Sequence, residues 1–107
     1  EIIVSLSKMT FFERFEEDIL SGKKTITIRD ASEKDYSSGS IVQVSTYEND
    51  RRFCTLKIKG VETITFSDLS DFHAKQENMT ISELKNVIQK IYPNVENLYI
   101  ISYELVT

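Results

Sequence analysis

The sequence has one cysteine, one histidine and no long hydrophobic run, and each absence argues against a class of protein. A lone cysteine, Cys54, cannot form an internal disulfide or a cysteine-based metal cluster, and it fits a reducing compartment, so we expect a cytoplasmic protein. No apolar segment approaches the ~20 residues that a membrane-spanning helix needs. Ser5, Ser7 and Lys8 follow the apolar start in place of a longer apolar run, which argues against a signal peptide.

Glycine and positive charge are also scarce. The three glycines are scattered singly, so the chain lacks a glycine-rich phosphate cradle. Seventeen acidic and thirteen basic side chains give a net charge of -4, which disfavours a long polyanion because its affinity comes largely from phosphate neutralisation. A small substrate fits this balance better. The length of 107 residues predicts one domain, residues 1–107, and we expect a monomer.

The first third of the chain predicts a helix and then a strand. Thr10 to Glu13 has the spacing of a capping box, so we expect a helix from Thr10 that ends at Gly22. Residues 25–29 alternate with period two, which places Ile26 and Ile28 on one face and the threonines and arginine on the other. Residues 1–9 form either a strand or a loose lead-in.

The remaining pattern predicts a hairpin, a longer strand, helices and a final strand. Residues 41–47 and 53–58 form the hairpin, and Gly60 marks a bulge before an extended stretch to residue 66. A short helix follows Ser67, and a second capping box at Thr80 begins a long helix that Pro93 stops. Residues 98–106 form the last strand. This order predicts an α+β fold, a small mixed β-barrel with flanking helices.

The stretch from Gly22 to Asp30 concentrates polar side chains at a helix end and a strand start. The Thr27 hydroxyl is a weak nucleophile unless a base takes its proton, and Lys24 can be that base if its pKa is lowered. Because residues three apart on one strand face opposite sides, Lys24 would have to lie in the turn. The ordinary alternative is a solvated lysine beside a threonine chosen for its strand propensity.

Other candidates have ordinary explanations as well. Glu77 lies between two short helical signals, where a carboxylate can project into a cleft or simply be solvated. His73 is expected to be structural or on the surface, since a metal site would need more ligands, and Cys54 is expected to be buried. Aromatic residues of the strands could stack on a nucleobase but more often lie in a core: Tyr47, Phe53, Tyr99 and Tyr103.

Two segments resemble the ASCH-domain family, and in particular its small bacterial N(4)-acetylcytidine amidohydrolases. The first runs from Thr10 to Phe15 and then from Asp18 to Asp30, and includes Gly22-Lys23-Lys24-Thr25. The second runs from His73 to Thr80 and continues with Glu83-Leu84-Lys85 and Ile91-Tyr92-Pro93. The Gly-x-Lys-Thr core is shared across the family, whereas both segments together at this separation indicate the amidohydrolase branch.

The resemblance implies a PUA-like fold and an enzyme that cleaves the acetyl amide of N(4)-acetylcytidine. Position by position, the family's catalytic residues fall on Lys24 as base, Thr27 as nucleophile, and Glu77 as acid and orienting group. Lys23 and Arg29 are expected to bind substrate. No cofactor or metal is implied, and the expected partner is a nucleoside. Thr27 either attacks directly or positions a water, and the competing class is a PUA-like module that binds RNA or a nucleoside without chemistry.

Overall fold

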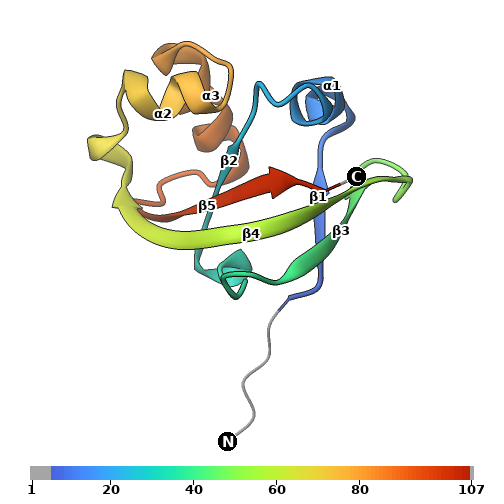
Figure 1. The fold of residues 1–107 in the computed structure, drawn as a ribbon. Coiled ribbons are helices and arrows are strands. Elements are labelled where there is room, and N and C mark those ends of the chain that lie inside the picture. Colours follow the sequence, from blue (N-terminus) through green and yellow to red (C-terminus); the bar gives the residue numbers. More distant parts are fainter. Residues whose placement is uncertain (1–5, 107) are drawn as a thin grey trace, which may run out of the picture.

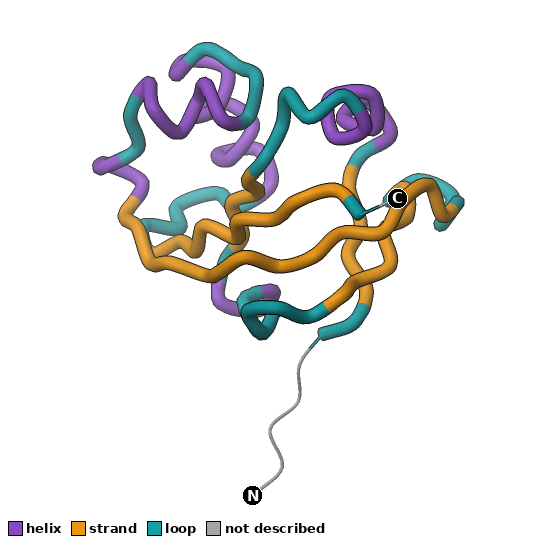
Figure 2. Tube along the Cα trace, in the orientation of Figure 1, coloured by secondary structure: helices purple, strands orange, loops and turns teal. Residues whose placement is uncertain are grey.

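A five-stranded mixed sheet forms the centre of the fold, and most helical turns lie on one side of it (Figures 1 and 2). The structure, a computed structural model, describes residues 6–106. The strand order is β1-β3-β4-β5-β2, with β1 parallel to β3 and every other pair antiparallel. The strands are β1 (Lys8–Phe11), β2 (Ile26–Arg29), β3 (Ile41–Thr46), β4 (Arg52–Thr65) and β5 (Asn97–Leu105).

The helical segments are short apart from the last. They are η1 (Glu13–Phe15), α1 (Glu16–Leu20), η2 (Ala31–Glu33), η3 (Phe66–Asp68), α2 (Asp71–Gln76) and α3 (Ile81–Ile91). Among residues 6–106 no helix has the length and hydrophobicity to cross a membrane. The predicted α+β class is confirmed.

The predicted hairpin and its extension form the longest part of the sheet. β3 pairs with β4, and β4 continues past a register shift between Ile58 and Gly60 to pair along β5. Figure 1 shows β4 as the long curved strand that spans the molecule. The predicted bulge at Gly60 and the extension beyond it are confirmed.

The prediction of a helix beginning at Thr10 is wrong. Thr10 lies in β1, where it is in register with Ser45, and the first helical turn begins at Glu13 without a side-chain cap. Met9 and Phe11 are both buried in the core, so this segment alternates as a strand does. Burial of these two side chains outweighs a capping signal that is worth about 1 kcal/mol. A strand through Ile2 and Val4 would lie outside the described residues.

The second capping box is confirmed at Thr80. Its hydroxyl accepts from the Glu83 amide at 3.1 Å, and the Glu83 carboxylate accepts from the Thr80 amide at 3.0 Å. The helix that follows buries Leu84 and Ile88 against the sheet. Each such side chain contributes about 1.5–3 kcal/mol by leaving water. α3 is therefore anchored at its start by the cap and along its length by packing.

Two core clusters cover the two faces of β2. Ile26 and Ile28 belong to the cluster beneath α2 and α3. Thr27 is in register with Ile101, which belongs to the other cluster together with Phe11. All four residues of β2 are buried. The predicted division of faces is confirmed, and the polar face of β2 points into the protein.

The sheet is not closed, so the word barrel describes the fold only loosely. β1 and β2 are its two edge strands, and among residues 6–106 no strand pairing joins them. A closed barrel would have a ladder of backbone hydrogen bonds at this place. The gap between β1 and β2, which we call the seam, is where the predicted functional residues gather.

Candidate active site

The turn after α1 directs Lys24 inward. Gly22 closes the helix with a φ of 80°, a conformation that glycine adopts without steric cost. The backbone amides of Lys23 and Lys24 both donate to the Asp18 carbonyl, at 2.9 and 3.0 Å. The chain then enters β2 two residues later. Lys24 thus lies in the turn, as predicted, and its neighbour Lys23 is exposed.

The Lys24 side chain ends in a buried environment of few polar groups. Only 3% of the residue is exposed. Its ammonium nitrogen donates to the Ile26 carbonyl at 2.9 Å and contacts the Glu77 carboxylate. The same nitrogen lies 5.5 Å from the ring centroid of Phe11 and 5.2 Å from that of Phe15. A lysine so enclosed has lost most of its hydration, which disfavours its charged form.

Glu77 reaches the same place from the end of α2, 53 residues further along the chain. It is the C-terminal cap of that helix, and only 4% of it is exposed. The Thr25 amide donates to the Gln76 carbonyl at 2.8 Å, which ties the start of β2 to the end of α2. The structure therefore brings two of the three predicted catalytic residues into contact.

The pKa of Lys24 is lowered to about 7. Burial is the main cause and the Arg29 guanidinium is the second, while Asp18 acts in the opposite direction. The adjoining Glu77 carboxylate, which contacts the Lys24 nitrogen, also favours the ammonium. Near neutral pH this lysine is accordingly able to exist as an amine.

The buried pair is expected to control folding stability as well as chemistry. Glu77→Leu should lower the free energy of unfolding by about 3–5 kcal/mol at pH 6, because it leaves a buried ammonium without its partner. The free energy of unfolding of Glu77→Leu should itself rise between about pH 7 and 10.5, since over that range the unfolded chain holds more protons on Lys24 than the folded protein does. Urea unfolding at several pH values measures both effects.

The double variant Lys24→Met/Glu77→Leu is the matched comparison. It removes both charges, so we expect an unfolding free energy within about 1 kcal/mol of the original protein or above it. If the double variant is instead as unstable as the sum of the two single variants, the pair is not coupled as its contact implies.

Thr27, the predicted nucleophile, is held by Arg29. Thr27 is 5% exposed, and its hydroxyl oxygen accepts from Nε of Arg29 at 2.9 Å. Among residues 6–106 no hydrogen bond joins Thr27 to Lys24. The structure thus groups the predicted residues as two buried pairs, Lys24 with Glu77 and Thr27 with Arg29.

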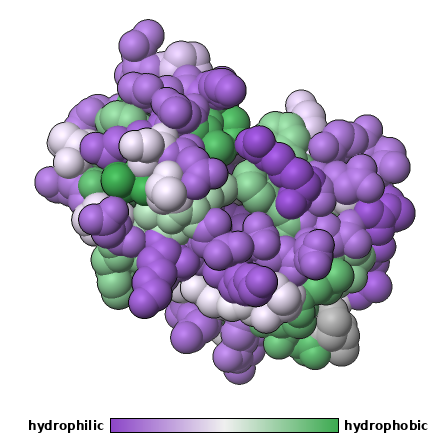
Figure 3. All heavy atoms as spheres, turned by 90° about the horizontal axis from the view of Figure 1, so that it is seen from above, coloured by the Kyte–Doolittle hydropathy of each residue, from purple (hydrophilic) through white to green (hydrophobic). Residues whose placement is uncertain are grey.

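A cavity of about 200 Å³ opens at the seam above these pairs. Its walls are largely aromatic and apolar, and its polar groups include the two cations of the pairs. The lining residues are Thr10, Phe11, Phe12, Phe15, Lys24, Ile28, Arg29, Glu33, Tyr47, Ile91 and Tyr92. Figure 3 shows the molecule from above, where hydrophobic side chains come to the surface in a depression between mostly polar parts.

A more open hollow of about 680 Å³ lies over η1 and α1. Charged side chains such as Glu13, Arg14 and Arg51 surround it, and none of the predicted site residues lines it. We therefore place the candidate site in the smaller cavity, which is lined by both Lys24 and Arg29.

The other predicted candidates have structural roles or peripheral positions. Cys54 is buried, and burial raises the pKa of its thiol to about 11, which disfavours a reactive thiolate. His73 accepts from the Ser70 amide at 3.1 Å and so caps α2. Of the aromatic residues considered for stacking, Tyr47 lines the cavity, whereas Tyr103 lies in the core. Both expectations for Cys54 and His73 are confirmed.

Sequence reasoning missed the aromatic wall formed by Phe12 and Phe15, together with Glu33 and Tyr92. The two phenylalanines lie in the segment predicted to be a helix from Thr10, and only their position between β1 and α1 turns them towards the cavity. The Glu33 carboxylate accepts from the Tyr92 hydroxyl across 59 residues. No local pattern signals such a contact, since the two residues lie far apart in the sequence and the motif that contains Tyr92 does not include Glu33.

Comparison with known proteins identifies relatives across nearly the whole chain. A family model described as ASCH domain matches residues 6–106. A curated protein of Vibrio atlanticus, named N(4)-acetylcytidine amidohydrolase, is 67% identical over 98 residues, covering 92% of this chain and 94% of its own. A protein of the same name from a Shewanella species is 55% identical over 98 residues, and the alignment covers 92% of this chain and 95% of that protein.

Solved structures of low sequence identity share the fold. The ASCH domain of Lactobacillus crispatus superposes with a TM-score of 0.75 at 12% identity, over 94% of this chain and 80% of that one. The ASCH protein of Zymomonas mobilis has a TM-score of 0.69 at 10% identity, over 92% of this chain and 68% of that one. The predicted PUA-like fold is confirmed, with a sheet that stays open.

Proposed function

This chain belongs to the ASCH domain family, and we propose that it is an amidohydrolase that removes the acetyl group from N(4)-acetylcytidine. Cytidine and acetate are the products. The observation that carries the proposal is the buried contact of Glu77 with Lys24, a lysine that lines an aromatic cavity. Close relatives that carry this name support the choice of substrate.

The first step is attack on the acetyl carbonyl. Lys24 in its amine form takes the proton of the Thr27 hydroxyl, directly or through one water, and the freed oxygen bonds to the carbonyl carbon. A lysine whose pKa lies near 7 suits this task, because a useful fraction is unprotonated and yet the amine still binds a proton.

The second step releases the nucleoside. The bond between the carbonyl carbon and N4 breaks, and N4 receives a proton from the Lys24–Glu77 pair as cytidine departs. Glu77 also orients the cytosine by hydrogen bonding to its polar edge. Water then hydrolyses the acetyl ester on Thr27, giving acetate and restoring the hydroxyl. In the alternative route Thr27 positions a water that attacks directly, and the same proton transfers apply.

The shape and lining of the cavity support a flat, mostly apolar substrate. Phe12 and Tyr47 pack edge to face with ring centroids 5.2 Å apart, and both line the cavity. Aromatic side chains of this kind bind the faces of planar rings. In the proposed complex a pyrimidine base lies against these rings, and its exocyclic acetyl group is directed towards Lys24. A net charge of -4 disfavours binding of a long phosphate backbone.

The direct experiment is incubation of purified protein with N(4)-acetylcytidine and chromatographic separation of the products. We expect cytidine and acetate in equal amounts, without added metal. A mobility-shift assay with short RNAs is run beside it. Tight, salt-sensitive RNA binding with no deacetylation would overturn the proposal in favour of a binding module.

The pH dependence of the rate is expected to report Lys24. Since the base is the amine, kcat/KM should rise with pH through a midpoint at about 7 or somewhat higher, because Glu77 favours the ammonium. Glu77→Gln removes that carboxylate, so its midpoint should move to lower pH although its rate is reduced. A profile that falls with rising pH across this range would contradict the assignment of Lys24 as base.

A further inference from the structure

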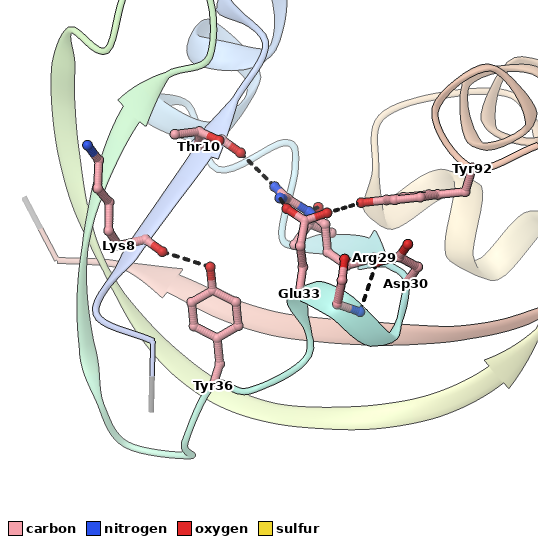
Figure 4. Close-up of polar contacts among 9 residues, drawn as sticks. Lys8, Thr10, Arg29, Asp30, Glu33, Tyr36 and Tyr92 are labelled. Carbon is pink, nitrogen blue, oxygen red and sulfur yellow. Dashed lines mark hydrogen bonds and ion pairs between the residues drawn. The ribbon is translucent and has the colours of Figure 1, made fainter. Parts of the chain in front are cut away.

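Arg29 links two other elements, β1 and η2, to the threonine of the site. Its Nε donates to the Thr27 hydroxyl at 2.9 Å, Nη1 to the Glu33 carboxylate at 2.9 Å, and Nη2 to the Thr10 carbonyl at 2.7 Å. We call these three contacts the Arg29 bridge. Figure 4 shows the guanidinium between Thr10 and Glu33, with Glu33 also meeting Tyr92. The bridge spans the seam, because Thr10 lies in β1 and Arg29 in β2.

The guanidinium is held rigidly in this position. Only 9% of Arg29 is exposed, and its Cζ lies 5.0 Å from the ring centroid of Phe11. Glu33, which accepts from Nη1, is itself fixed by the Tyr92 hydroxyl at the end of α3. An arginine restrained by a carboxylate, a backbone carbonyl and an aromatic face loses little further freedom when it makes an additional hydrogen bond.

The contact with Thr27 has a direct chemical consequence. A hydroxyl has one proton and two lone pairs, so a fixed donor at the oxygen limits the directions in which that proton can point. As the proton leaves, negative charge grows on the oxygen, and a hydrogen bond from a cation to such an oxygen becomes stronger. The Arg29 guanidinium thus stabilises the negative charge that develops on the Thr27 oxygen during the reaction.

We propose that Arg29 is a positioning residue that fixes the Thr27 hydroxyl and places a permanent positive charge beside it and Lys24. The inference rests on the proposed function for its catalytic part. Lys24 and Arg29 both lie over the same Phe11 ring, at 5.5 and 5.0 Å, so their charges share one small buried region. Arg29 acts through Thr27 and Lys24, and it differs in this from a residue that holds the substrate.

The charged groups that face Lys24 determine what removal of Arg29 should do. Glu77 from the end of α2 and Asp18 from α1 favour the ammonium, whereas Arg29 from β2 disfavours it. Loss of the Arg29 charge should therefore raise the pKa of Lys24. The midpoint of the pH profile should move to more alkaline pH, a change that a merely structural role would not produce.

Two substitutions separate the charge from the hydrogen bond. Arg29→Gln removes both, and we expect kcat to fall about 10²–10³-fold, as for loss of one preorganised donor, with KM changed less than about threefold. Its pH midpoint should shift upward. Arg29→Lys keeps the charge but cannot reproduce the three-way geometry, so the midpoint should stay near that of the original protein while kcat remains low.

The matched control is Arg52→Gln, the same substitution at an exposed arginine of β4 that does not line the cavity. It should leave kcat and the pH midpoint unchanged. Thermal unfolding of each variant shows whether it is folded under assay conditions. If Arg29→Gln keeps the kcat of the original protein, the positioning role is wrong. If kcat/KM falls only because KM is raised, Arg29 binds substrate and does not position Thr27.

A measurement without turnover separates this inference from the proposed function. The Lys24 side chain, labelled with carbon-13, is titrated by NMR in the original protein and in Arg29→Gln. We expect the midpoint to be higher in the variant. An unmoved midpoint would overturn the inference even in an active enzyme. Conversely, an original protein that leaves N(4)-acetylcytidine intact would overturn the proposed function, while the titration would still decide the effect of Arg29 on Lys24.

Discussion

Lys24→Met is expected to reduce kcat for N(4)-acetylcytidine by about 10³-fold or more, the upper part of the range for loss of a general base. Methionine has a similar length and fits a buried site, but it cannot accept a proton. The substitution leaves the buried Glu77 carboxyl without its partner, so thermal unfolding is used to check that the variant is folded. Steady-state kinetics with product chromatography gives kcat and KM separately, and the loss should fall on kcat.

Two controls make this result specific. Lys24→Arg should be as inactive as Lys24→Met, because a guanidinium stays charged and cannot act as the base. Lys57→Met, at an exposed lysine of β4, should have full activity. If Lys24→Met retains more than about a tenth of the original rate, proton transfer must involve another group, since a general base contributes about 10²–10⁴-fold.

Thr27→Val is expected to cause a loss of similar size. Valine preserves the shape and strand propensity of threonine while removing the hydroxyl, so the acetyl group has neither a nucleophile nor a group that positions water. Nε of Arg29 also loses its acceptor, which should cost about 1–3 kcal/mol of stability. Thr27→Ser should recover much of the activity, because it restores the oxygen on the same backbone.

Mass spectrometry of rapidly quenched reactions distinguishes the two routes open to Thr27. An acetyl group on the peptide that contains Thr27 indicates direct attack. An inactive Thr27→Val together with an unmodified original protein indicates a positioned water. Wild-type turnover by Thr27→Val would show that the nucleophile has been assigned to the wrong residue.

The kinetics of these variants should not be additive. Lys24, Thr27 and Glu77 act on the same proton, so removing a second member of the group costs little once the first is gone. A Lys24→Met/Thr27→Val double variant should therefore be nearly as active as either single variant. Additive losses would indicate that the two residues serve independent steps.

The sequence predicted correctly those elements that are determined by residues close together in the chain. The hairpin, the bulge at Gly60 and the capped start of α3 depend on neighbours within a few residues, and each was confirmed. Thr10 shows the limit of such signals. Its capping-box spacing is genuine, but the parallel pairing with β3 and the burial of Met9 and Phe11 depend on residues more than thirty positions away.

The candidate site was predictable in part for the same reason. The turn geometry required Lys24 to lie outside β2, and the structure has it there. The contact of Lys24 with Glu77 joins residues 53 apart, and only the resemblance to known proteins suggested that they belong together. The Arg29 bridge depends on the seam, which exists because the sheet stays open, and openness has no signature in the sequence of any one strand.

In this fold, closing the sheet between β1 and β2 and keeping an open active-site cavity exclude each other. Lengthened edge strands could satisfy each other's backbone groups and finish the cylinder, but the aromatic cavity would then be filled by main chain. In the present arrangement one arginine side chain crosses where a row of amide bonds would otherwise run. We therefore expect redesign towards a sealed cylinder to give a protein that is harder to unfold and chemically inert.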